Sequence, residues 1–318
     1  MIKSICKMAV FSTLLVAGVS QAEEVTLKFG YPVNEENIWH KAAMEFKRVA
    51  ESQSDGRIEV KLYPSEQLGK EMEVINSIQL GTADMTITGE SLQNWAPKAA
   101  LLAVPYAFTS SEQLQAAVNG EVGMEISEQI VERTGLQPIA WFERGPRHLT
   151  SNRPIMSPDD LNGLKLRVPN VPLFVKLWEA LGAKPIPMAF SEVFTSLQQG
   201  TIDGQENPLS LINSASFYEV QEYVNLTGHV RSWIYVVIGQ EQLNSMPADL
   251  RSIVLDAAQQ MQEYEHSMFA SDEAQLRATL EERGMTFVNP DLEAFRSAAQ
   301  RAVQEALTAE QLELFEKI

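Results

Sequence analysis

Two arginines stand at positions where a positive charge is costly or scarce. Arg167 ends an apolar segment with the pattern of a buried strand, and Arg147 follows Gly145-Pro146 at a predicted hinge. The chain carries 42 acidic and only 25 basic residues, so an inward-facing arginine is informative. Since a guanidinium binds a carboxylate through two parallel hydrogen bonds, these residues predict recognition of an organic acid. An internal salt bridge for each arginine is the alternative that spacing alone leaves open.

Motifs of catalysis and of cofactor binding are missing from the sequence. It contains no Gly-x-Gly-x-x-Gly, no Walker loop and no Gly-x-Ser-x-Gly. The histidines lie far apart, and none belongs to a His-Glu-x-x-His pattern: His40, His148, His229 and His266. The single cysteine, Cys6, falls in the N-terminal leader described below. We therefore expect no enzyme, no cofactor and no metal site.

A twelve-residue pattern occurs twice, from Glu73 to Asp84 and from Glu192 to Asp203, with identical residues at seven positions. Each copy has the pattern of an amphipathic helix, closed by a glycine that favours the left-handed conformation of a helix end. A short apolar strand and then polar residues follow. In an open α/β sheet, ligands bind beyond the carboxyl ends of such strands. The repeat therefore predicts two similar lobes facing each other across a cleft.

Residues 1–22 have the features of a signal peptide. Lys3 and Lys7 precede an apolar run from Met8 to Val19, and residues 20–22 form a small-x-small cleavage site. The run is shorter than the roughly 20 residues that span a bilayer. Without the two lysines of this leader, the net charge changes from −17 to −19, which disfavours nucleic acid and anionic lipid. We expect an exported, periplasmic protein with no direct membrane insertion after cleavage.

The elements that must position the arginines alternate between strands and helices. Residues 25–31 and 57–63 alternate as strands do, and residues 38–52 between them have helical spacing. The second lobe repeats this scheme, with a strand at 164–168 and a helix at 173–181. Such alternation predicts an α/β fold with a mainly parallel sheet.

Two longer segments predict helices. Residues 111–133 have helical spacing throughout. Residues 248–283 contain neither glycine nor proline, and as a single helix they would measure about 54 Å, long enough to run along both lobes. Ser271-Asp272 could instead begin a second helix as a cap.

Long, ordered motifs run through the mature chain. They are Leu62-Tyr63-Pro64, Gln67-Leu68-Gly69, Gly145-Pro146-Arg147, Thr150-Ser151-Asn152-Arg153-Pro154-Ile155, Asp160 to Asn170, Leu181 to Phe190, and Asp203-Gly204-Gln205-Glu206-Asn207-Pro208. Through these motifs the chain resembles the solute-receptor subunits of TRAP transporters, and it is most similar to the sialic-acid and sugar-acid receptors. The resemblance implies a two-lobed periplasmic binding protein fold with a hinge, a central cleft and a long helix along both lobes.

The resemblance also implies roles for residues of the second lobe. Arg167 would form the main salt bridge to the substrate carboxylate, supported by Arg147. Asn170 and Asn207 would hydrogen-bond the ligand. Phe190 would pack on its carbon skeleton.

In the first lobe, Glu71 and Glu90 fall near the sequence positions at which the sialic-acid receptors have acidic residues. The match at Glu90 requires a shift of one residue between the two sequences. The alternative for Glu71 is a solvated residue in the first turn of a helix. Pro32 replaces an early asparagine of those receptors. Trp39 stands where C4-dicarboxylate receptors tend to have a lysine, which argues against a dicarboxylate.

We therefore expect a receptor that captures an organic acid, most simply a uronate, aldonate or sialate, and delivers it to TRAP permease subunits. Lobe I would comprise residues 23–145 plus about 233–272, and lobe II residues 146–232 plus about 273–318. The first lobe offers no obvious cation facing the cleft, which favours a polyhydroxylated monocarboxylate.

Two other functions remain as alternatives. The first is a C4-dicarboxylate or small keto-acid receptor of the same family. The second, from another class, is a secreted enzyme acting on an acidic sugar, with Glu71 and Glu90 as acid and base.

Overall fold

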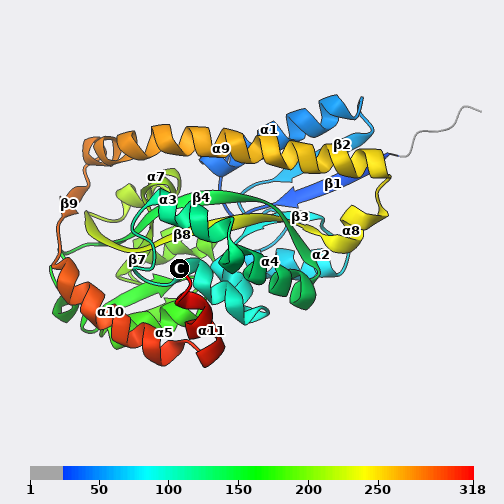
Figure 1. Ribbon diagram of the computed structural model, residues 1–318. Coiled ribbons are helices and arrows are strands. Elements are labelled where there is room, and N and C mark those ends of the chain that lie inside the picture. Colours follow the sequence, from blue (N-terminus) through cyan, green and yellow to red (C-terminus); the bar gives the residue numbers. More distant parts are fainter. Residues whose placement is uncertain (1–23) are drawn as a thin grey trace, which may run out of the picture.

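The computed structural model describes residues 24–318, apart from the side chain of Ala274. The expected signal peptide at residues 1–22 lies outside the described residues. Within the described part of the chain, no helix combines the length and the apolar character needed to cross a membrane. The fold is a two-lobed α/β structure in which one nine-stranded sheet extends through both lobes (Figure 1).

The sheet joins two groups of parallel strands through a pair of long antiparallel ones. The strands are β1 (Val25–Gly30), β2 (Ile58–Tyr63), β3 (Met85–Thr88), β4 (Leu136–Ser151), β5 (Lys165–Val168), β6 (Lys184–Pro187), β7 (Gly204–Pro208), β8 (Tyr223–Gly239) and β9 (Thr286–Val288). Their order is β2-β1-β3-β8-β4-β7-β5-β6, with β9 beside β8. The pairs within β2-β1-β3 and within β7-β5-β6 are parallel, as the alternating pattern predicted. Because β4 and β8 continue from one group to the other, the lobes are connected by hydrogen-bonded strands.

The helices pack around this sheet. They are α1 (Ile38–Gln53), α2 (Glu71–Gln79), α3 (Ser111–Val118), α4 (Glu121–Thr134), α5 (Pro172–Ala180), α6 (Val193–Gln198), α7 (Leu209–Ser214), α8 (Gln240–Ser245), α9 (Ala248–Glu282), α10 (Leu292–Ala306) and α11 (Ala309–Phe315). The 3₁₀ turns are η1 (Glu90–Asn94), η2 (Pro97–Ala103), η3 (Pro158–Leu161), η4 (Phe190–Glu192) and η5 (Phe217–Glu219). The single helix predicted over residues 111–133 is wrong, because the chain breaks it at Gly120 into α3 and α4. A Cβ at that position would lie 2.7 Å from the Ala116 carbonyl oxygen, so the break depends on glycine.

The sequence repeat is also a structural repeat. One copy forms α2 and leads into β3, the other forms α6 and leads into β7, and the glycine of each copy has a φ of 72° or 68°. In the first copy the carboxylate of Asp84 accepts the backbone N–H of Lys28 at 2.7 Å. In the second, Asp203 accepts that of Lys165 at 2.9 Å. The shared acids thus fasten each helix–strand connection to the neighbouring parallel strand.

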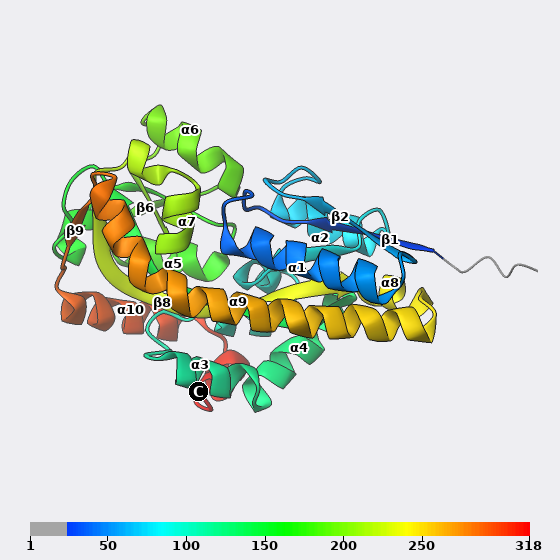
Figure 2. The same cartoon turned by 90° about the horizontal axis from the view of Figure 1, so that it is seen from above.

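The long helix α9 is continuous through Ser271-Asp272, so the prediction of one helix is confirmed over Ala248–Glu282. It lies along the molecule over both lobes, with α10 and α11 on the opposite side (Figure 1). Viewed from above, α1 lies beside its first half and α7 near its second (Figure 2). Phe46 of α1 shares a buried apolar cluster with Ala257 and Met261 of α9.

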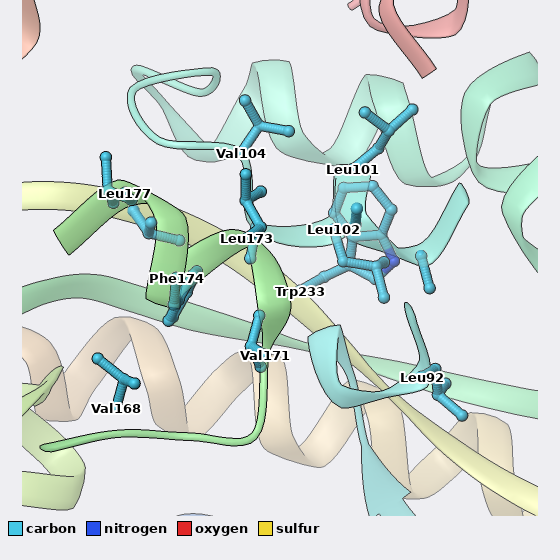
Figure 3. Packing of buried hydrophobic residues seen from close by; sticks show 14 of the residues in the cluster. Leu92, Leu101, Leu102, Val104, Val168, Val171, Leu173, Phe174, Leu177 and Trp233 are labelled. Atoms are coloured by element: carbon cyan, nitrogen blue, oxygen red, sulfur yellow. The ribbon is translucent and has the colours of Figure 1, made fainter. Parts of the chain in front are cut away.

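A second apolar cluster packs elements of both lobes together. Trp233 of β8 is fully buried there with Leu101 and Leu102 of η2, and Leu173 and Phe174 of α5 belong to the same cluster (Figure 3). Close packing of these side chains holds β8, η2 and α5 together.

Candidate functional site

A cavity of about 290 Å³ lies between the lobes, and all eight residues that the sequence singled out line it. These residues are Trp39, Glu71, Glu90, Arg147, Arg167, Asn170, Phe190 and Asn207. They come from the N-terminal ends of α1 and α2, from strands β4, β5 and β7, and from the segments that follow β3, β5 and β6. The fold therefore brings the carboxyl ends of strands from both lobes to one place, as the repeat predicted.

Arg167 lies near the end of β5 and is 3% exposed. Its Nε and Nη2 both donate to the carbonyl oxygen of Met188, at 3.1 and 2.7 Å. Its Cζ lies 5.9 Å from the ring centroid of Phe190. Burial lowers the pKa of Arg167 to about 10, so the guanidinium stays charged at neutral pH. One edge of the fork is thus held by the protein, and the other is left for an anion in the cavity.

Arg147 is engaged internally. Its Nε and Nη2 donate to the two carboxylate oxygens of Glu206 at 2.5 and 2.7 Å, and Nη2 also donates to the Glu206 carbonyl. His229 Nε2 lies 2.8 Å from the same carboxylate. Burial alone would raise the pKa of Glu206, but Arg147 and His229 outweigh it and lower the pKa to about 2. The internal salt bridge left open by the sequence is therefore realised at Arg147.

Arg144 is a cavity residue that the sequence analysis missed. Its Nη1 donates to both carboxylate oxygens of Glu90, at 2.7 and 2.6 Å, and its Cζ lies 5.7 Å from the Trp39 ring. Arg147 Nη1 is 3.5 Å from the same Glu90 carboxylate. Burial would raise the pKa of Glu90, but the two arginines lower it overall. The only sequence signal for Arg144 was its place three residues before Arg147, in a chain poor in cations.

Glu71, the first residue of α2, is not a solvated residue of a helix turn. Its carboxylate accepts the hydroxyls of Thr88 at 2.7 Å and Ser91 at 3.1 Å. Burial, together with the nearby charge of Glu90, raises the pKa of Glu71. A carboxyl group held this way is oriented toward the cavity wall formed by β3 and η1.

The two asparagines are held by polar neighbours. Asn207 Nδ2 donates to Gln205 Oε1 at 2.6 Å, and the backbone carbonyl of Asn170 accepts from Asn94 Nδ2 at 2.9 Å. Pro32, which the sequence marked as a departure, also lines the cavity.

Lys70 and Glu66 were missed as well, and both line the cavity from the first lobe. Lys70 Nζ lies 2.8 Å from Glu192 in the second lobe, and Glu66 accepts the hydroxyl of Ser191. The expectation that the first lobe directs no cation at the cleft is therefore wrong, because Lys70 belongs to it. The pattern gave no hint, since Lys70 reaches its partner only when the lobes face each other.

Residues that could hold a metal ion do not gather in the part of the chain that the structure describes. Within residues 24–318 there is no group of three or more histidine, cysteine or acidic side chains with suitable geometry. Glu90 and Glu71 of the cavity instead face an arginine and hydroxyl groups.

Comparison with known proteins places this architecture among solute receptors. Residues 29–310 match the family model of bacterial extracellular solute-binding proteins, family 7. A solute-binding protein of Roseobacter denitrificans is 57% identical over 91% of this chain and 89% of its own length. The sialic acid-binding periplasmic protein of Vibrio cholerae is 31% identical, over 95% of each chain.

Solved structures show the same fold. The crystal structure of the Roseobacter denitrificans protein, a TRAP periplasmic solute-binding protein with bound L-galactonate, has a TM-score of 0.91 and 56% identity and covers 93% of this chain and 98% of that one. A TRAP periplasmic solute-binding protein from Sulfurospirillum deleyianum with bound succinate has a TM-score of 0.86 and 27% identity, over 92% of this chain and 99% of that one.

Proposed function

Since this chain belongs to the bacterial extracellular solute-binding proteins of family 7, the receptors of TRAP transporters, we propose that it captures a sugar acid and delivers it to membrane permease subunits. The ligand carboxylate binds Arg167, and the hydroxyl groups meet the polar wall of the first lobe. Asn170 and Asn207 hydrogen-bond the ligand between these two ends.

The observation that carries this proposal is the pairing of the cavity cations. Arg144 is matched by Glu90, and Arg147 by Glu206. Arg167, by contrast, forms no salt bridge with any described residue and donates only to a carbonyl oxygen. One unmatched, buried guanidinium calls for one carboxylate from outside.

The pairing of the cavity cations with acids of the protein also favours a ligand with a single carboxylate. A second carboxylate would have to displace Glu90 from Arg144 or Glu192 from Lys70, and it would approach Glu66 and Glu71 as well. Hydroxyl groups meet no such penalty, because they donate to carboxylates and accept from guanidinium groups. The Roseobacter denitrificans structure holds L-galactonate, a monocarboxylate of this kind.

The volume of the cavity bears on ligand size. At about 290 Å³ it lies at the lower end of the roughly 300–1,000 Å³ usual for small-molecule sites. A six-carbon acid suits this space better than a sialic acid with its nine-carbon skeleton and acetamido group. The resemblance to sialic-acid receptors therefore extends to the architecture and the carboxylate anchor, while we assign a smaller ligand.

The lobes move about a hinge at their boundary, between residues 145 and 146, near 232–233 and near 272–273. The register of β4 against β8 shifts between Arg144 and Arg147, which supports this position. Gly145 there lies against α9, and a Cβ would come 2.6 Å from a carboxylate oxygen of Glu273. Closure about this hinge encloses the ligand. The protein acts in the periplasm after removal of residues 1–22, and it performs no catalysis.

One observation favours the C4-dicarboxylate alternative enough to test it: the relative from Sulfurospirillum deleyianum holds succinate. Titration calorimetry of the mature protein at pH 7 with L-galactonate, galacturonate, gluconate, N-acetylneuraminate, succinate and malate decides between the two. We expect a sugar acid to bind at least about tenfold more tightly than either dicarboxylate. Tight succinate or malate binding with no response to any sugar acid would overturn the proposal.

A further inference from the structure

Arg144 and Glu90 form a polar group at the part of the cavity that a carboxylate on Arg167 does not fill. Arg144 uses only Nη1 for Glu90, and its Nε is buried with no hydrogen-bond partner among the described residues. Arg147 Nη1, next to the same carboxylate, is buried and unpartnered in the same way. Arg144 and Glu90 nevertheless both line the cavity, so the parts of the guanidinium group and of the carboxylate that face it can bind polar groups of an occupant.

The sheet places this group on the first-lobe side of the anchor. Arg147 pairs with Pro208 of β7 and with Val230 of β8, whereas Arg144, earlier in β4, has a partner in the described sheet only in β8, at Ser232. Glu90 follows β3, on the far side of β8. Arg167 lies on β5, beyond β7 in the other direction. A ligand held by its carboxylate at Arg167 therefore extends toward Arg144 and Glu90.

We infer that Arg144 and Glu90 together bind the hydroxyl groups at the end of the ligand remote from its carboxylate, and so select an open-chain polyhydroxy monocarboxylate. This inference rests on the proposed function. A hydroxyl group accepts one hydrogen bond and donates another, so adjacent hydroxyls fit a guanidinium that donates beside a carboxylate that accepts. The ion pair fixes both partners before the ligand arrives, which lowers the entropy cost of binding.

The aromatic residues of the cavity support an open chain over a sugar ring. The Cζ atoms of Arg144 and Arg167 lie over the rings of Trp39 and Phe190, at 5.7 and 5.9 Å from the centroids. One guanidinium group thus lies over each ring, which leaves less aromatic surface on which a pyranose ring could stack. A flexible polyol chain needs no such face, only donors and acceptors along its length.

The first test changes the ligand and leaves the protein intact. L-galactonate and the three-carbon glycerate carry the same carboxylate and neighbouring hydroxyl, but glycerate lacks the three hydroxylated carbons at the remote end of L-galactonate. Calorimetry with L-galactonate, and displacement titration with glycerate, should show at least about tenfold weaker binding of glycerate. Equal affinities would overturn the inference.

The second test removes the ion pair with both partners at once, because a single substitution would leave the other charge buried and alone. In the Arg144→Gln/Glu90→Gln double variant, L-galactonate should bind at least about tenfold more weakly, while the affinity for glycerate stays within about twofold. The matched control is Arg231→Gln/Glu143→Gln, which removes another arginine–glutamate pair, 3.0 Å apart, between β8 and β4 and outside the cavity lining. It should leave both affinities unchanged.

The two proposals fail in different ways. If Arg167→Ala abolishes L-galactonate binding but the double variant keeps the wild-type ratio of L-galactonate to glycerate affinity, the role of Arg144 and Glu90 is wrong and the proposed function stands. If no polyhydroxy acid binds the wild-type protein, both are wrong.

Discussion

Arg144 and Arg147 are three residues apart in strand β4, yet both guanidinium groups reach the carboxylate of Glu90. In a regular strand, residues separated by an odd number of positions point to opposite faces. The register of β4 against β8 shifts between these two arginines, at Gly145-Pro146, and this irregularity turns both side chains toward the cavity. The same segment, at which we predict the hinge, thus brings two positive charges to the cavity.

The first prediction concerns the carboxylate anchor. Arg167→Ala should lower the affinity for the best sugar acid on the order of 10²- to 10³-fold, because the ligand carboxylate would lose its buried partner. Arg167→Lys should not restore binding, since an ammonium group cannot reproduce the two-pronged contact. Calorimetry measures both, with the exposed Arg301→Ala on α10 as control. Near wild-type affinity in either Arg167 variant would contradict the assignment.

The second prediction concerns the salt bridge that crosses the cavity mouth. Lys70 and Glu192 are each about half exposed, and exposed ion pairs contribute little. Glu192→Gln should therefore change the affinity for a sugar acid by less than about fivefold, with a smaller difference at high salt. A loss comparable to that of Arg167→Ala would show that this pair, rather than the buried anchor, holds the closed state.

The third prediction is that the fold loses stability at low pH as Glu206 becomes protonated. Because the folded-state pKa of Glu206 is about 2, below its ordinary value of 4.5, its carboxylate stabilises the fold above about pH 4.5. That contribution is lost as the pH falls from 4.5 toward 2. Glu206→Gln leaves Arg147 buried without its carboxylate and should cost about 3–5 kcal/mol at neutral pH.

Thermal melting at several pH values measures this effect. The wild-type melting temperature should fall steeply between pH 4.5 and 2, and that of Glu206→Gln should start lower and fall less. Glu219→Gln, an exposed substitution, serves as control and should behave as the wild type. A Glu206→Gln protein as stable as the wild type at pH 7 would rule out the stabilising role of the pair.

The fourth prediction concerns Glu265, which is fully buried on α9 with no hydrogen-bond partner for its carboxylate among the described residues. Burial raises its pKa well above the ordinary 4.5. As the pH rises above 4.5, the unfolded chain ionises first, so the folded state loses relative stability. Glu265→Gln should remove this loss and raise the free energy of unfolding at pH 7 by about 1–3 kcal/mol.

At pH 4, Glu265→Gln should no longer raise the free energy of unfolding, because the carboxyl group of Glu265 is then largely protonated in both the folded and the unfolded state. Chemical denaturation at the two pH values tests this, with the exposed Glu263→Gln as control. An equal increase in the free energy of unfolding at both pH values would show that Glu265→Gln acts through side-chain packing rather than through the ionisation of Glu265.

Much of the fold was predictable because it depends on local patterns. The alternation of Leu27 and Phe29 with polar neighbours, the helical spacing of Ala43 and Phe46, and the absence of glycine and proline from residues 248–283 each act within one element. The repeated Asp84 and Asp203 likewise perform the same local task twice. The break at Gly120 was missed although its cause is also local, because helical spacing continues across it and only the backbone geometry brings this residue against the Ala116 carbonyl oxygen.

The sequence by itself determined which residue types could form an anion site and in which order the elements carry them, so Arg167 could be named in advance. The resemblance to a known family added Glu71 and Phe190. Only the tertiary structure decided which arginines of the cavity form a salt bridge with a glutamate and which one forms none with any described residue. Arg147 meets Glu206, and Arg144 meets Glu90, through pairings of strands and turns that are distant in sequence. Charge neutralisation depends on distances of a few ångströms between such elements, and residue spacing along the chain does not encode those distances.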